Sequence, residues 1–463
     1  MPSALDFYLI TDLHHYSHTL GISGEAYEKK DMREQLCLAE TGAIIDAYID
    51  KILEDKDTNI VLVAGDVSNN GAMASHLELI PKLRRFKDAG KRVFLITATH
   101  DYYIEGNAVG DPVRLVGSEE LPAERTDREQ LVELYREFGI DEAISFHKES
   151  HSYCVKLQEG YRLLCLNDDG DRSFCGYSDD QLQWILEQIK DAKDAGDYIF
   201  AMTHHPTLPP MPLYHIISNG DMLGDWDKTT TLLADAGIGL MFTGHAHMHN
   251  IGLKVTEKGN RYYDVNTSAL VGYPSNMRKV RIDDEKIEIH SLSIDSFDWD
   301  MKGMSVDEYT KHHFSFMINQ ILDAAADDFE YFADLAESFS MRHEQSYKLR
   351  KPITFVGKGL RKWTLGSVGR ILGVSKKIDP SVKDLVARDI ILELIQNAFH
   401  GNEPYYPDTP LYIAVSAILD RISKPLSHFK KTKDVALLLQ ALKQSFYNAE
   451  PDDYELVIER KKI

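Results

Sequence analysis

Short apolar runs alternate with helical patterns through the first 295 residues, and this alternation limits the folds that the chain can adopt. Residues 59–64 read Asn-Ile-Val-Leu-Val-Ala and are followed by a glycine. Strands that are apolar on both sides belong to sheets covered by helices on both faces, as parallel sheets are. Comparable runs lie at residues 7–11, 92–97, 152–157, 162–166, 198–202 and 239–242, before a strand-rich tract at 251–294. They predict an α/β fold, and a four-layer α/β/β/α sandwich of two sheets accounts for their order better than a single sheet.

The pattern changes after residue 297. Helical periodicity then predominates and strand signals nearly vanish, so we expect an all-helical domain at 298–463 after an α/β domain at 1–297. A length of 463 residues is enough for two or three domains. The helices expected in the α/β part lie at 31–53 and 72–89, and those expected in the C-terminal part lie at 306–338, 382–400, 410–422 and 433–447.

The chain is acidic, with 52 Lys and Arg against 73 Asp and Glu and a net charge of −21. Such a chain repels polyanions at long range, so we expect no nucleic-acid partner. We expect its four cysteines, which include no CxxC pair, to be free thiols in a reducing compartment. The N-terminus has no signal-peptide pattern, and no apolar run approaches the roughly 20 residues that span a bilayer. The expected location is therefore the cytoplasm.

Acidic residues and histidines follow five of the apolar runs. In open α/β sheets, ligands bind outside the carboxyl ends of the strands, so these side chains can converge on one site. Taken singly, each segment also fits a helix cap, a turn or a surface loop. Their repeated position at strand ends favours a common site. The five segments are Asp12-Leu13-His14, Gly65-Asp66, Thr99-His100-Asp101, His204-His205 and Gly244-His245-Ala246-His247.

This mixture of side chains is suited to metal ions. Imidazole and carboxylate ligands suit Zn, Mn and Fe, and the lack of sulfur argues against copper-thiolate or iron–sulfur centres. Residues two apart on an extended segment share a face, which places Asp12 beside His14 and His245 beside His247. A carboxylate such as Asp66 can bridge two cations, and two cations about 3.5–4 Å apart form the clamp used in phosphoryl hydrolysis.

These five segments, with Gly65-Asp66 extended through Asn69-Asn70-Gly71, resemble the calcineurin-like metallophosphoesterase superfamily. The resemblance covers residues 6–292, and it makes 1–297 the catalytic domain and 298–463 a helical C-terminal domain. Residues 13–29 and 266–270 are similar to a bacterial branch that includes cyclic-nucleotide phosphodiesterase-like proteins. A DNA-repair nuclease of the same superfamily is disfavoured by the net charge.

The resemblance implies a role for each site residue. His100 would contact a phosphate or leaving-group oxygen, with Asp101 orienting its ring, and a hydroxide shared by two metals (Mn, Fe or Zn) would attack phosphorus in line. The expected substrates are small phosphoesters, with phosphodiesters such as cyclic nucleotides favoured over phosphomonoesters. The implied metal ligands are Asp12, His14 and His247 for the first ion, Asp66 as the bridge, and His204 and His245 for the second ion.

One segment departs from the family pattern. Ala98-Thr99 stands where the family has Gly-Asn, whose amide oxygen would ligate the second ion. The Thr99 hydroxyl is shorter and a weaker ligand, so water or another side chain would complete the shell, or the second ion would be weakly held. The alternative function is therefore a metal-containing binding or regulatory module with damped catalysis. His205 is expected either to support the site or lie at the surface, or else to contact substrate.

Residues 346–377, here called the basic segment, contain no Asp or Glu. The segment has nine Lys and Arg, so the rest of the chain carries a net charge of −30. We expect it to dock on the acidic surface of the protein itself. The alternative is a patch that faces anionic lipid or substrate.

Overall fold

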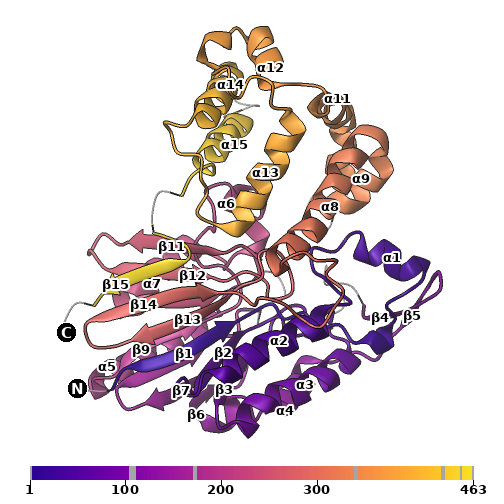
Figure 1. The fold of residues 1–463 in the computed structure, drawn as a ribbon. Coiled ribbons are helices and arrows are strands. Elements are labelled where there is room, and N and C mark those ends of the chain that lie inside the picture. Colours follow the sequence, from indigo (N-terminus) through magenta and orange to yellow (C-terminus); the bar gives the residue numbers. More distant parts are fainter. Residues whose placement is uncertain are drawn as a thin grey trace. The chain divides into compact units, whose positions relative to one another are not determined.

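The computed structural model describes residues 3–103, 111–169, 175–337, 343–428, 433–448 and 451–460. Two sheets dominate its first part (Figure 1). The six-stranded sheet has the order β15-β14-β13-β1-β2-β3, and the seven-stranded sheet has the order β11-β12-β10-β9-β8-β7-β6. The strands of the first sheet are β1 (Leu5–Ile10), β2 (Ile60–Ala64), β3 (Arg92–Ile96), β13 (Met277–Ile282), β14 (Lys286–Leu292) and β15 (Glu455–Glu459).

The second sheet is built from strands β6 to β12. Its central strands β8, β9 and β10 are parallel, as are β1, β2 and β3 of the first sheet. A separate hairpin is formed by β4 (Val113–Val116) and β5 (Glu119–Pro122). The strands of the second sheet are β6 (Ala143–His147), β7 (Ser152–Gln158), β8 (Tyr161–Cys165), β9 (Tyr198–Met202), β10 (Leu240–Thr243), β11 (Asn250–Val255) and β12 (Arg261–Asn266).

The side chains of each central strand alternate between two cores, as the period of a strand requires. On β2, Leu62 and Ala64 enter the core between the two sheets, whereas Val61 and Val63 enter the core beneath α2 and α3. On β9, Phe200 faces the inter-sheet core, and Ala201 packs in the core that contains α5 and α7 residues. The four-layer α/β/β/α sandwich predicted from the sequence is confirmed.

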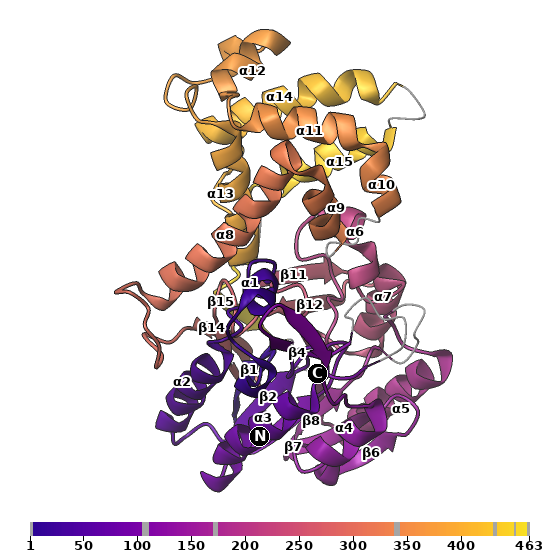
Figure 2. The same ribbon diagram turned by 90° about the vertical axis from the view of Figure 1, so that its right-hand side faces the viewer.

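Helices cover both outer faces of the sandwich. Figure 2 shows α2 and α3 on one side of the sheets and α5 and α7 on the other. The helices in residues 1–297 are α1 (Glu25–Asp31), α2 (Thr41–Glu54), α3 (Met73–Asp88), α4 (Arg128–Tyr135), α5 (Asp179–Ala195), α6 (Tyr214–Ile217) and α7 (Trp226–Ala236).

One expected helix is interrupted. The sequence predicts a helix over 31–53, but α1 ends at Asp31 and α2 begins at Thr41. The apolar residues between them are buried from a loop, whose Cys37 amide donates to the Val271 carbonyl at 3.0 Å. Apolar spacing predicted burial correctly, but it could not separate a buried loop from a helix face.

The C-terminal part is mainly helical, with its own core around Leu365, Ile390 and Leu411. None of the helices that the structure describes is long and apolar enough to cross a membrane. The helices are α8 (Val306–Asp327), α9 (Phe329–Glu337), α10 (His343–Lys348), α11 (Arg350–Leu360), α12 (Leu365–Leu372), α13 (Ala387–His400), α14 (Pro410–Leu426) and α15 (Lys433–Gln444).

The chain divides into two compact units. The first unit contains Met1–Pro210, Gly220–His313 and Pro451–Ile463, and the second contains Met211–Asn219 and Phe314–Glu450. The sequence predicts only helices in 298–463, and the structure differs there. β15 pairs antiparallel with β14, beside which it lies in yellow in Figure 1, and so belongs to the first unit. A five-residue strand whose partner is about 165 residues away leaves too weak a local signal to be recognised.

Candidate metal centre

All six predicted metal ligands lie in loops that follow parallel strands of the two sheets. Asp12 and His14 follow β1, and Asp66 follows β2. His204 follows β9, and His245 and His247 follow β10. Backbone hydrogen bonds join these loops: the Asp12 amide donates to the Gly65 carbonyl at 3.1 Å, and the Gly244 amide donates to the His204 carbonyl at 2.9 Å. These bonds tie the ligand loops within each sheet, and the His245 amide, which donates to Oδ2 of Asp12 at 3.1 Å, joins the loops of the two sheets.

The six side chains form two groups of three. In the first group, Nε2 of His14 and Nε2 of His247 are 3.1 Å apart, and Oδ1 of Asp12 lies 3.5 Å and 3.3 Å from them. The second group contains Asp66, His204 and His245. Oδ2 of Asp66 lies 2.9 Å from Nε2 of His204 and 3.8 Å from Nε2 of His14. Asp66 is thus within reach of both groups.

These distances fit the ligand shells of two metal ions. Metal–nitrogen and metal–oxygen bonds of about 2.0–2.2 Å place neighbouring ligands of one ion about 3.0–3.5 Å apart. Among the described residues, the buried side-chain atoms without a hydrogen-bond partner include Oδ2 of Asp66 and Nε2 of His204. Since unpaired buried polar atoms are costly, atoms that converge in this way are best satisfied by cations.

The backbone is strained at the same residues. Asp12, His14, Asp66, His245 and His247 have φ values of 50°, 36°, 47°, 65° and 55°. Non-glycine residues with positive φ are uncommon, and they persist where the surrounding structure enforces them. Their concentration in the ligand loops indicates that the fold maintains this geometry for a functional site.

Two glycines allow the loops to approach closely. A Cβ at position 244 would lie 2.3 Å from Oδ2 of Asp12 and 2.3 Å from Oγ1 of Thr11. At position 65, where φ is 96°, a Cβ would lie 2.6 Å from Nδ1 of His204. Any larger residue at either position would displace a predicted ligand.

A sequence family described as calcineurin-like phosphoesterase matches residues 5–249, which is more than half of the chain. The chain belongs to this family. A search among curated proteins found no match. The family expected from the five segments is therefore confirmed.

Solved structures of phosphatases are similar to this family member. A dimetal phosphatase from Danio rerio shares 11% sequence identity with a TM-score of 0.45, over 62% of this chain and 95% of that chain. A purple acid phosphatase from yellow lupin seeds (Lupinus luteus) shares 12% identity with a TM-score of 0.39, over 63% and 52%. A NAD nucleotidase from Haemophilus influenzae shares 10% identity with a TM-score of 0.32, over 79% and 62%. Because these scores are low, the family assignment depends on the sequence match and the site.

The charges of this phosphoesterase centre keep its carboxylates in the ionised form, in which they can bind a metal ion. Burial opposes ionisation of Asp12, but the rings of His14 and His247 outweigh it and hold the pKa of Asp12 well below its usual range. Burial likewise opposes protonation of His204, but the charges of Asp66 and Asp12 raise its pKa to about 10. Burial and the neighbouring rings of His205 and His204 hold the pKa of His245 well below its usual range. The carboxylates are thus kept in the ionised form that binds cations.

His100 borders the first group of ligands. Its ring packs edge-on against the ring of His14, with centroids 4.8 Å apart. Its amide donates to Oδ1 of Asp66 at 2.9 Å. Burial lowers the pKa of His100 to about 4. His100 is therefore placed beside the ligands, as expected of a residue that contacts substrate there.

The structure differs from the expected role of Asp101. Its two carboxylate oxygens accept from the backbone amides of Ser68 and Ala98, each at 2.8 Å. Nδ1 of His100 lies 3.2 Å from Oδ1 of Asn70 instead. Asp101 thus fixes the loops after β2 and β3, and Asn70 contacts the ring that Asp101 was expected to orient. Spacing within the His100-Asp101 pair could not show that the two side chains diverge.

The Thr99 side chain is partly buried and makes no hydrogen bond to any described residue. Within the part of the chain that the structure describes, its hydroxyl is therefore not committed to a partner.

Two supporting residues were missed by sequence reasoning. Oε1 of Gln35 lies 3.0 Å from Nδ1 of His247, and Gln35 reaches it from the loop between α1 and α2. Asp168 accepts the amides of His204 and His205 at 3.1 and 2.8 Å. Asp168 follows β8, so the strand-end rule that found the other site residues could also have identified it. No local pattern marks Gln35.

His205 is a buried supporting residue. Its Nδ1 lies 2.8 Å from Oδ1 of Asp168, and its Nε2 lies 2.9 Å from Sγ of Cys175. Its ring packs on the ring of His245, with centroids 4.1 Å apart. His205 thus supports a predicted ligand from behind.

Proposed function

We propose that this chain is a dinuclear metal-dependent phosphoesterase that hydrolyses small phosphoesters. The observation that carries the proposal is the pair of three-residue ligand groups, with Asp66 within reach of both. Asp12, His14 and His247 would hold one ion, His204 and His245 the other, and Asp66 would bridge them. Mn, Fe or Zn, in divalent or trivalent states, suits nitrogen and oxygen donors of this kind. When bound, such ions polarise a phosphoryl oxygen and supply a nucleophile at neutral pH.

The remaining side chains have distinct tasks in this proposal. His100 would contact a phosphate or leaving-group oxygen, because its ring lies against a ligand of the first group. Asn70 would fix the orientation of that ring through Nδ1. Asp101 would hold the two loops in place through their amides. Gln35 and Asp168 would keep His247 and His204 in position, and such outer contacts tune metal affinity.

Phosphodiesters such as cyclic nucleotides are the favoured substrates, and phosphomonoesters are the next. The support is the similarity of residues 13–29 and 266–270 to the cyclic-nucleotide phosphodiesterase-like branch. A net charge of −21 disfavours long polyanionic substrates and so favours small ones. The four free cysteines favour a reducing compartment, and we place the protein in the cytoplasm on that ground.

The test combines metal analysis with turnover. Purified protein should contain Mn, Fe or Zn and should hydrolyse bis(4-nitrophenyl) phosphate faster than 4-nitrophenyl phosphate when Mn²⁺ is added. Asp66→Asn should lower turnover by at least about 100-fold, since it removes the charge shared by both groups. Asp57→Asn, which changes an exposed carboxylate, is the matched control. Protein without metal, and with no turnover of either ester after metal is added, would refute the proposal.

A binding or regulatory module is the second candidate, and Thr99 favours it because the family amide is absent there. Thr99→Asn should then tighten the second ion and raise turnover at limiting Mn²⁺. The measurement is activity against Mn²⁺ concentration for both proteins. Superimposable curves would show that position 99 causes no ligand deficit. Tight metal and phosphoester binding without turnover in either protein would establish the binding module.

A further inference from the structure

The basic segment is only partly neutralised by its own unit. It spans α10 (from Ser346), α11, α12 and the turn up to Lys377. Lys348 pairs with Glu344 at 2.6 Å, and Arg350 lies 3.7 Å from Glu330. Arg361 binds Asp323 and Asp327 of α8 at 2.5 and 2.7 Å. The other six cations are exposed and have no ion-pair partner among the described residues: Lys351, Lys358, Lys362, Arg370, Lys376 and Lys377.

One face of α11 is fixed against α8. A Cβ at Gly357 would lie 2.8 Å from the carbonyl carbon of Ala325 and 2.9 Å from the nitrogen of Ala326. The two helices therefore meet at a glycine, where no side chain separates the backbones. Arg361, one turn further on, completes the contact through its pairs with α8. The expected docking on the protein's own acidic residues is thus confined to this side of α11.

The opposite face of α11 alternates lysine with apolar side chains. Lys351, Phe355 and Lys358 follow the spacing i, i+4 and i+7, which places them on one side of the helix, and Lys362 follows in the turn after it. Phe355 is 68% exposed and Val356 is 43% exposed. Large apolar side chains exposed together and rimmed by cations indicate a binding surface. The surface here called the α11 face comprises Lys351, Pro352, Phe355, Val356 and Lys358 of the helix, and Lys362 of the turn after it.

We propose that the α11 face binds the surface of an anionic phospholipid membrane. Its lysines pair with lipid phosphates, while Phe355 and Val356 enter the boundary between headgroups and acyl chains. A flat array of negative charge above an apolar layer is complementary to lysines that flank an apolar stripe. The whole chain, with a net charge of −21, would be repelled by an anionic membrane. The attraction is therefore confined to the basic segment, which has nine cations. On α12, Arg370 is followed by Ile371, which is 79% exposed. A cation thus again adjoins an exposed apolar side chain.

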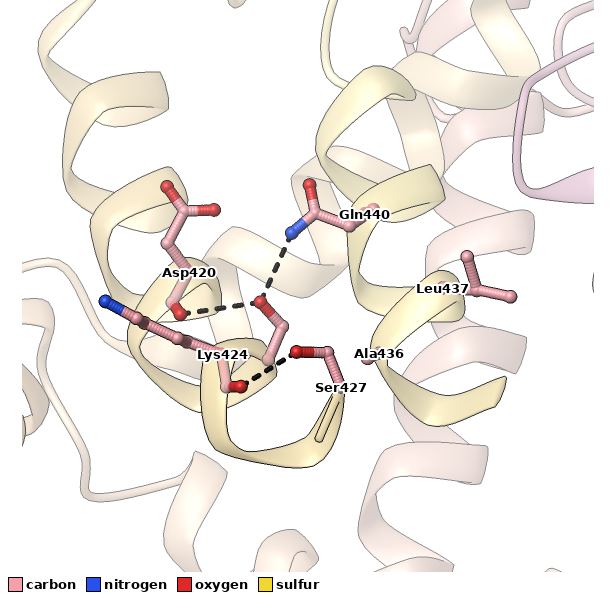
Figure 3. Close-up of a pocket in the computed structure, with 7 residues that line it drawn as sticks. Asp420, Lys424, Ser427, Ala436, Leu437 and Gln440 are labelled. Atoms are coloured by element: carbon pink, nitrogen blue, oxygen red, sulfur yellow. Dashed lines mark hydrogen bonds between the residues drawn. The ribbon is translucent and has the colours of Figure 1, made fainter. Parts of the chain in front are cut away.

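The hollows of the helical unit support the choice of a surface rather than a pocket. Figure 3 shows a hollow between α14 and α15 that is lined by Lys424, Ser427 and Gln440. Its volume is about 380 Å³. Gln440 donates to Ser423 at 3.2 Å, and Ser427 donates to the Lys424 carbonyl at 2.9 Å. Its hydroxyl and amide groups are paired internally. A second hollow, of about 510 Å³, is lined by Arg421, Lys424 and His428 beside Ile371, and none of its described lining residues is a carboxylate. It adds positive charge next to an exposed apolar side chain.

The test is cosedimentation of the full-length protein with vesicles. We expect binding to vesicles of phosphatidylcholine mixed with phosphatidylserine, no binding to phosphatidylcholine alone, and weaker binding at higher salt. The triple variant Lys351→Gln, Lys358→Gln, Lys362→Gln should bind about 100-fold more weakly, at about tenfold for each 1.4 kcal/mol. Phe355→Ser should weaken binding by at least about tenfold. Because these side chains are exposed, the variants should keep the melting temperature of the parent.

A matched control separates a specific face from general charge. Lys148→Gln, Lys228→Gln, Lys302→Gln removes three exposed lysines from the first unit with the same change of net charge. This variant should bind vesicles as the parent does. Equal weakening by both triple variants, or equal binding to both kinds of vesicle, would overturn the proposal. Retention of the parent on heparin without vesicle binding would also overturn it, in favour of a polyanion partner.

Discussion

Replacing Asp168 should lower both the free energy of unfolding and the affinity of the centre for metal. Its Oδ2 accepts the amides of His204 and His205 and the Thr203 hydroxyl, at 3.1, 2.8 and 2.8 Å. Its Oδ1 lies 2.8 Å from Nδ1 of His205. Burial opposes its ionisation, but the neighbouring charge of His205 keeps the pKa of Asp168 well below its usual range. The carboxylate is thus ionised, buried and fully used as an acceptor.

Asp168→Ala leaves these donors buried without an acceptor. Removing one partner of a buried charged pair costs about 3–5 kcal/mol, so the free energy of unfolding should fall by about 4 kcal/mol. Asp168→Asn retains one carbonyl oxygen and should cost about 2 kcal/mol. Because the His204 amide loses its anchor, affinity for one metal ion should fall by about 10–100-fold in both variants. Denaturant unfolding and metal titration measure the two effects.

Asp197→Ala is the matched control. Asp197 is a buried carboxylate that accepts from Nε of Arg162 at 2.7 Å, but it precedes β9, whereas the ligand His204 follows that strand. The control should also lower the free energy of unfolding, but it should leave metal affinity unchanged. If Asp168→Ala costs less than about 1 kcal/mol, or if metal affinity survives it as in the control, the argument from its hydrogen bonds is wrong.

Three further predictions concern other parts of the chain. His100→Ala should lower turnover by about 10²–10⁴-fold with metal content unchanged, and equal turnover would remove His100 from the mechanism. Burial lowers the pKa of His76 from 6.5 to about 4, so the folded state binds fewer protons than the unfolded state, and stability falls as pH drops from about 6.5 to about 4. His76→Gln should reduce this loss of unfolding free energy by about 3 kcal/mol, as measured by denaturant unfolding at pH values of about 6.5 and about 4. Parallel pH profiles of stability for the variant and the parent would contradict the prediction. Arg361→Ala should destabilise the helical unit by about 1 kcal/mol, and by less in high salt. The control variant Lys362→Ala should change stability by no more than about 0.5 kcal/mol. Equal melting temperatures of the two variants would show that the ion pairs of Arg361 with Asp323 and Asp327 contribute nothing.

The sequence predicted the sandwich and the ligand groups for one physical reason. Parallel strands place their carboxyl ends at one edge, so residues that follow each strand, such as Asp12 and Asp66, are brought together by topology alone. The family resemblance then distributed them between two ions, and the structure groups them in the same way.

Contacts that depend on loop paths could not be predicted. Gln35 reaches His247 only because it lies in the loop between the end of α1 at Asp31 and the start of α2 at Thr41. Asn70 approaches His100 because Asp101 turns toward the amides of Ser68 and Ala98. Local pattern identifies which residues are buried or lie at a strand end, but the direction of a side chain in a loop depends on partners far away in sequence.

The return of the chain to β14 through Glu455–Glu459 makes the helical unit an insertion in the sandwich rather than a tail. A fragment that stops at residue 297 would therefore lose an edge strand and expose the unpaired backbone of Lys286–Leu292, which invites aggregation. It would also remove the Asp453 carbonyl, which accepts a hydrogen bond from the buried Arg278 guanidinium. The first unit should instead be isolated by excising residues 314–450 and joining residue 313 to residue 451 through a linker.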